Sequence, residues 1–189
     1  MKCELWYSVV VRDRKGKILS RERRRSRSFL KQWNQLVYLH LSMVASLTMT
    51  DIGGVSRAGT RSKYSFRMNA PIANINYGIV IGTDNTAVLI SDYALGARIA
   101  EGVGAGQMNY QASSVATSVV AAPTCGWIAS RAIVNNSGLT ITVREAGIYG
   151  WLTEFSSWWV ALVRDVLGTP QDVPDGGSMT INYTLRVSV

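Results

Sequence analysis

The sequence predicts a mainly β protein: an antiparallel β-sandwich preceded by a β-hairpin, one amphipathic helix and a long extended loop. The clearest sign is segment 179–189, where apolar and polar residues alternate over eleven positions. That period of two is typical of a strand with one face on a core and the other in water. Seven or more strand-like segments follow one another at spacings of 8–15 residues, separated by Gly, Pro and Asn turns, as in a sandwich.

Residues 5–25 are predicted to form the hairpin. Alternation runs from Leu5 to Arg12, and the turn at 13–17 contains Gly16, which tolerates a positive φ. The return strand and the residues after it carry five arginines: Arg21, Arg23, Arg24, Arg25 and Arg27. A run of like charges suits either a solvated arm or an ordered strand whose charge a partner neutralises, and we expect the second.

A helix is predicted to run from an N-cap at Ser28 to about Leu47. Apolar residues at three- and four-residue spacing would form its buried stripe; they are Phe29, Trp33, Leu36, Val37, Val44 and Leu47. His40, the single histidine, lies on or beside this stripe and is expected to be a packed or surface residue.

Residues 48–76 are predicted to form a long, irregular loop, because they are rich in Gly, Ser, Thr, Arg and Asn. Loops of this length inside domains are usually functional. Basic residues alternate here with Tyr64 and Phe66, which suits either packing on a neighbouring subunit or binding of single-stranded nucleic acid. We favour subunit packing.

The main β-domain is expected to begin at Tyr77. Asn135 to Gly138 is a tight turn that would join strands 127–134 and 139–149 as a hairpin. Residues from Trp151 to Trp158 are predicted to form a loop, and segment 159–167, apolar on both faces, a central strand. The remaining expected strands are 77–82, 107–112 and 115–121.

Charge divides the chain unevenly. Residues 1–70 include 15 basic and 4 acidic residues, whereas residues 71–189 include 5 basic and 8 acidic residues. We therefore predict a basic assembly region at 1–76 and a β-sandwich domain at 77–189. The basic region is expected to face something anionic, either nucleic acid or an acidic surface of another subunit.

No catalytic, metal or cofactor site is predicted. One histidine without a nearby nucleophile does not make a catalytic pair, and no spacing selects a pair among the carboxylates. Glu145 is expected to form an ordinary salt bridge with Arg144. Cys3 and Cys125 show no metal-binding spacing; two free thiols are expected, with a disulfide left open. Neither a signal peptide nor a membrane span is predicted.

Several segments together resemble a family of uncharacterised structural proteins of tailed viruses that infect bacteria and archaea. They include RDRKGKILSRERRRSRSFLKQWNQLVY, SDYALGARIAEG, RAIVNNSGLTITVREAGIYG and VPDGGSMTINYTLRV. The resemblance implies a virion building block, assembled in the host cytoplasm, and supplies no catalytic residues. Its position in the particle does not follow from the resemblance.

We therefore expect a non-enzymatic virion structural protein that self-assembles, docks on capsid, neck or tail subunits and has no membrane partner. The expected contact residues include the five arginines together with Tyr64, Phe66, Trp151 and Trp158. Nucleic-acid binding through the arginine run, including contact with packaged DNA, is the alternative. Binding of a host receptor or glycan through Trp151 and Trp158 is the weaker one.

Overall fold

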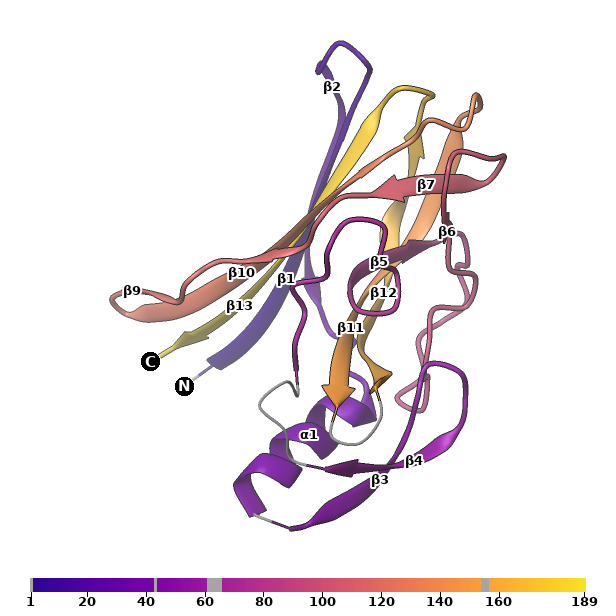
Figure 1. Ribbon diagram of the computed structural model, residues 1–189. Coiled ribbons are helices and arrows are strands. Elements are labelled where there is room, and N and C mark those ends of the chain that lie inside the picture. Colours follow the sequence, from indigo (N-terminus) through magenta and orange to yellow (C-terminus); the bar gives the residue numbers. More distant parts are fainter. Residues whose placement is uncertain (1, 43, 61–65, 154–156) are drawn as a thin grey trace.

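The computed structural model describes residues 2–42, 44–60, 66–153 and 157–189 (Figure 1). Over these ranges the chain is mainly β, as the sequence predicts, with one short helix. The elements in chain order are β1 (Lys2–Arg12), β2 (Ile18–Ser26), α1 (Lys31–Ser42), β3 (Ser46–Thr50), β4 (Ser56–Thr60), β5 (Gly78–Gly82), β6 (Ala100–Glu101), β7 (Gln107–Tyr110), β8 (Ser114–Val115), β9 (Val119–Ala121), β10 (Thr124–Val134), β11 (Ile141–Thr153), β12 (Ser157–Val173) and β13 (Ser178–Ser188).

The strands form three sheets. The largest has the order β2-β1-β13-β10-β7-β6, with β8 and β9 also paired to β10. The second has the order β12-β11-β5, and β3 pairs with β4 in the third. Described strand pairs are antiparallel except for β6 and β7, which run parallel, so the prediction of antiparallel pairing throughout is wrong there.

The predicted N-terminal hairpin is part of the largest sheet. β1 pairs with β2 across a turn in which Gly16 has φ +83°, a value that favours glycine. The other edge of β1 pairs with β13 along its whole length, from Lys2 with Ser188 to Arg12 with Ser178. The first strand of residues 1–76 therefore lies inside the same sheet as β13.

The predicted hairpin between segments 127–134 and 139–149 is wrong. β10 pairs with β13 over eleven residues, whereas β11 pairs with β12 and β5 in the second sheet. The turn between them moves the chain from one sheet to the other. Asn135, fully buried, fixes this crossing, because its side-chain amide donates to the carbonyls of Leu139 (2.7 Å) and Val173 (2.8 Å).

The helix is shorter than predicted at both ends. Residues 28–30 are extended along β12: the amide of Leu30 donates to the carbonyl of Leu162, and Ser28 accepts from Arg164. At the other end, residues 46–50 form β3 instead of a last helical turn. Pairing with strands satisfies the backbone at both ends, which outweighs local helix propensity. The helix buries Leu36 and Leu39.

β12 lies at the edge of the second sheet, so its predicted central position is wrong. It is apolar on both faces because α1 packs on it and residues 28–30 run beside it. The described residues of the predicted loop at 151–158 are strand, since β11 extends to Thr153 and β12 begins at Ser157; residues 154–156 lie outside the described ranges. Within the predicted loop 48–76, β3 and β4 form a two-stranded ribbon.

The core lies between the two larger sheets and α1. It is built from the predicted alternating faces, with Val9, Ile81, Val163 and Ile181 fully buried. No helix in the described ranges is long and apolar enough to cross a membrane.

Candidate interaction surfaces

The largest sheet has an inner face, which turns toward the core, and an outer face. Side chains of the inner face form rows across the strands, because paired residues point to the same side. At one end of the sheet, Val11, Met179 and Ile133 form a fully buried row. The next rows toward the other end, through Ile181 and Tyr183, are buried as well. The side chains of these rows are mainly apolar, but Arg131, which pairs with Ile181, is buried among them.

Toward the opposite end of the sheet, the side chains of the inner face are still apolar but become exposed to solvent. Cys3 and Cys125 both pair with Val187, and Val120 pairs with Cys125, so the four form one row. Val187 is 39% exposed and Val120 78% exposed. We call this row the distal apolar patch. It lies where β1, β9, β10 and β13 project away from the rest of the molecule (Figure 1).

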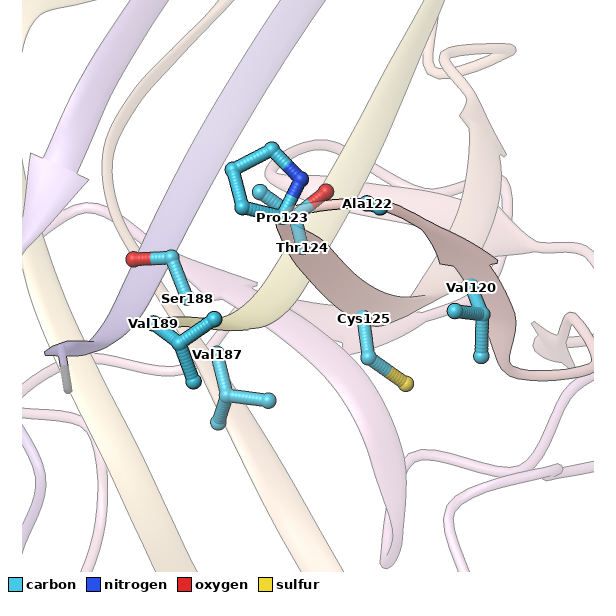
Figure 2. Close-up of a pocket in the computed structure, with 8 residues that line it drawn as sticks. All are labelled: Val120, Ala122, Pro123, Thr124, Cys125, Val187, Ser188 and Val189. Atoms are coloured by element: carbon cyan, nitrogen blue, oxygen red, sulfur yellow. The ribbon is translucent and has the colours of Figure 1, made fainter.

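A groove of about 270 Å³ opens at this patch. In Figure 2, Val120, Cys125 and Val187 point to the same side, and Pro123, which also lines the groove, lies in the turn between β9 and β10. Apart from Thr124 and Ser188, the side chains that line it are apolar or thiol, and none is charged. The groove therefore offers an apolar contact rather than a polar binding site.

The two cysteines are free, with Cys3 exposed and Cys125 partly buried. They lie on opposite sides of β13, two strand spacings apart, or about 9.5 Å. A disulfide needs Cα atoms within about 7 Å, so Cys3 and Cys125 of one chain cannot bridge without a backbone movement. The thiol of Cys125 lies 3.3 Å from the hydroxyl of Ser118.

The outer face of the sheet carries the first group of predicted contact residues. Arg21, Arg23 and Arg25 pair with Val10, Ser8 and Trp6, so their side chains share the outer face. All three are exposed. Arg23 lies over the indole ring of Trp6 at 5.0 Å, and Arg25 forms a long ion pair of 3.6 Å with Glu4. β2 is an edge strand, and charged side chains there also prevent pairing with another sheet.

Arg24 points to the inner face, where it forms an ion pair of 2.6 Å with Glu22. Glu22 also accepts hydrogen bonds from Tyr7 and from the backbone of Gly168, so it ties β2 to β12. Sequence analysis missed Glu22. The signal was available: it is the single acidic residue within the arginine run, and the period of two directs it inward.

The structure separates the other predicted contact residues. Arg27 is exposed just beyond β2. Phe66 packs edge-on against Trp33 (5.3 Å) and beside His40 (5.9 Å), so it belongs to the packing around α1. Tyr64 lies outside the described residues. The arginine run and Phe66 therefore do not form one basic-aromatic surface.

Trp151 and Trp158 do not form an exposed aromatic cluster. Trp158 is 7% exposed and lies against Gly59 of β4. Trp151 is partly buried and stacks on Tyr77 at 5.2 Å, with the guanidinium of Arg67 at 4.7 Å from its ring. The sequence clustered them beside a supposed loop, but in the structure they lie in paired strands whose side chains pack inward.

Arg164 is the centre of a buried ionic cluster that sequence analysis did not identify. Its guanidinium donates to Glu145 (2.8 Å), Asp92 (2.8 Å) and Asp84 (2.7 Å). Glu145 therefore pairs with Arg164. The predicted salt bridge between Glu145 and Arg144 is wrong. Its other oxygen accepts from Ala97, so the cluster fixes loop 83–98 on the second sheet. A groove of about 360 Å³ opens beside Arg164, but three carboxylates already occupy the guanidinium.

Asp165, the next residue, is buried beside Tyr183 between the sheets. Burial raises the pKa of Asp165 above its ordinary value, although the hydroxyls of Ser26, Ser28 and Tyr183 act in the opposite direction. In the part of the chain that the structure describes, neither Oδ2 of Asp165 nor the Tyr183 hydroxyl has a partner at normal hydrogen-bond geometry. The charged pair Arg164–Asp165 inside an apolar strand was the sequence signal for both sites.

Within the described ranges, no three His, Cys, Asp or Glu residues are grouped so that they could hold a metal ion. His40 bonds through Nδ1 to the carbonyl of Leu36 (2.8 Å), one helical turn away. Comparisons of the chain with protein-family models, with curated proteins and with solved structures found no match in any of the three.

Proposed function

We propose that this chain is a non-catalytic β-sandwich subunit that associates with copies of itself through the distal apolar patch, as a structural component of a virion. The observation that supports self-association is the change from buried to exposed side chains along the inner face of the largest sheet. Rows through Met179, Ile181 and Tyr183 are buried, whereas the row through Val187 holds only Val and Cys side chains, and its Cys3, Val120 and Val187 are exposed.

A second copy is a suitable occupant for chemical reasons. The patch spans four neighbouring strands, about 14 Å, and holds only Val and Cys side chains. Small, uncharged side chains let two sheets approach to the usual face-to-face distance of about 10 Å. Two copies of the same patch meet about a two-fold axis without bringing like charges together, as symmetric homo-oligomers require.

The virion role rests on the resemblance of the quoted segments to structural proteins of tailed viruses. In such a particle, the same subunit would also dock on capsid, neck or tail proteins. Negative-stain imaging of the purified protein tests this part: closed rings or regular oligomers are expected. A protein that remains monomeric at every concentration would contradict it.

Self-association is tested by a pair of variants on one strand. Val120 and Val119 are adjacent in β9, both exposed, and lie on opposite faces of the sheet. In light scattering coupled to size exclusion, the wild type is expected to form oligomers, Val120→Asp to be monomeric at the same concentration, and Val119→Asp to behave like the wild type. Equal effects of the two variants would rule out the patch as the interface.

A further inference from the structure

The hairpin of β1 and β2 carries a concentrated positive charge. Residues 12–27 contain nine basic and two acidic residues. Both acids are already engaged: the carboxylate of Asp13 accepts from the backbone amides of Lys15 and Lys17 at 2.9 Å, and Glu22 points inward to Arg24 and Gly168. Asp13 and Glu22 therefore neutralise little of the charge on the outer side of this hairpin, where Glu4 of β1 pairs with Arg25 and Arg186.

Three arginines form a regular row on that outer side. Arg21, Arg23 and Arg25 occupy alternate positions of one strand, so their Cα atoms are about 6.6 Å apart. β1, which is itself paired with β13, holds the strand in the sheet and fixes this spacing. Arginines at regular Cα spacing along one strand suit an evenly spaced row of anions better than a single acidic side chain.

Protection of the sheet edge explains a charge on β2, but not this row. A single charge is enough to oppose pairing with another edge, and lysine is the residue most often used. All the charged residues in β2 that point outward are arginines. Arginine differs from lysine in presenting a planar fork of donors that binds phosphate oxygens in pairs.

The neighbouring strands add neutral groups of the kind that contact a sugar-phosphate backbone. On the outer face, Trp6 lies beside Arg23, and Ser8 accepts a hydrogen bond from the side chain of Asn182 (3.3 Å). Thr180 and Thr184 flank Asn182 on the same face of β13. Hydroxyl and amide side chains commonly position a protein on nucleic acid, in addition to its arginines.

We propose that the outer side of the β1–β2 hairpin binds the phosphate backbone of nucleic acid without reading its sequence. Arg21 and Arg23 make the main contacts, while Arg25 is partly engaged by Glu4. The site is confined to this sheet face, because Phe66 is packed against Trp33 and contributes no stacking platform. It lies on the opposite face from the distal apolar patch, so both contacts can form on one molecule.

The test is a salt titration of binding to a fluorescent 30-base-pair duplex of arbitrary sequence. The wild type is expected to bind with a dissociation constant of about 10⁻⁴–10⁻⁶ M at physiological salt, with a steep salt dependence. The double variant Arg21→Gln/Arg23→Gln should lower the slope of log K against log salt by about 2 and weaken binding roughly tenfold or more near 0.1 M salt.

A matched control removes the same charge elsewhere. Lys31 begins α1 and Arg144 is exposed in β11, and neither lies on the outer face. The variant Lys31→Gln/Arg144→Gln should keep the slope of the wild type. Both salt titrations are repeated with the Val120→Asp substitution added to each protein. Because Val120→Asp is expected to be monomeric, a difference in binding then does not arise from self-association. All substituted positions are at least partly exposed, so melting temperatures should remain close to that of the wild type.

Three outcomes would overturn the proposal. An equal loss in the two double variants would mean that only net charge matters. Binding to anionic lipid vesicles without binding to the duplex would assign the row to a membrane surface. Binding to poly-glutamate as tightly as to the duplex, with the same dependence on Arg21 and Arg23, would assign it to an acidic polypeptide.

Discussion

Nε of Arg164 lies 2.8 Å from Oε2 of Glu145, and the side chains of both residues are almost completely buried. Removing one partner of such a pair leaves an uncompensated charge in the interior. Arg164→Met is therefore expected to lower the free energy of unfolding by about 3–5 kcal/mol, measured by urea denaturation. The double variant Arg164→Met/Glu145→Gln should be more stable than Arg164→Met alone, because it removes the stranded carboxylate.

Arg144 provides the control for this prediction. It is exposed on the same strand as Glu145, and Arg144→Met should change stability by no more than about 0.5 kcal/mol. A similar loss in Arg144→Met and Arg164→Met would show that the buried cluster contributes no more than an exposed charge.

Asp165 is expected to make stability depend on pH. Burial raises its pKa in the folded chain above the ordinary value of about 3.9, so folding favours the protonated form. Its contribution is fully present below about pH 4 and is lost as the pH rises through the raised pKa. Asp165→Asn should therefore be more stable than the wild type at pH 8, by about 1.4 kcal/mol per unit of pKa shift, and similar to it at pH 4. Urea denaturation at the two pH values measures the difference; an equal gain at both would refute this assignment.

Asn135 and Asn136 are adjacent but should tolerate substitution differently. Asn135 is fully buried, and its amide donates to the carbonyls of Leu139 and Val173 at the crossing between sheets. Asn135→Ala leaves those two acceptors unsatisfied and should cost about 2–4 kcal/mol in thermal or urea unfolding. Asn136 is exposed, and Asn136→Ala should cost less than about 1 kcal/mol. Comparable losses would mean that the crossing does not depend on the buried amide.

The two thiols report on the distal apolar patch. Cys3 should react with a soluble thiol reagent faster than Cys125, which is partly buried. If the patch packs against a second copy, the rate at Cys3 should fall several-fold as protein concentration rises through the dissociation constant. Single Cys→Ser variants assign the two rates. A concentration-independent rate in a protein that does oligomerise would place the interface elsewhere.

Local patterns in the sequence predicted the strands well, but not their partners. Alternation at 179–189 and at 5–12 depends only on neighbouring residues, and both segments are strands. The turn at Asn135 also has a local signal for a hairpin. That prediction failed because β10 finds eleven paired residues on β13, a partner chosen by long-range register that no local turn encodes.

The candidate surfaces show the same division. The outward position of Arg21, Arg23 and Arg25 follows from a period of two once the hairpin is known. The ionic cluster does not follow, since Arg164 is 72 residues from Asp92 and 80 from Asp84. Trp158 was expected at an exposed site because it ends the predicted loop 151–158, but β12 begins at Ser157 and directs the indole inward.

Pairing of β1 with β13 joins residues that are 166–186 positions apart, and this separation has a kinetic consequence. Contacts between distant segments form slowly, and a ribosome adds about 5–20 residues per second. The inner apolar face of β1 therefore waits roughly 10–40 s for its neighbour to be synthesised. During that interval β2 is the native neighbour of β1 in the described sheet that has already been synthesised. We expect its mutually repelling arginines to keep nascent chains apart and so to protect the protein from aggregation before its sheet is complete.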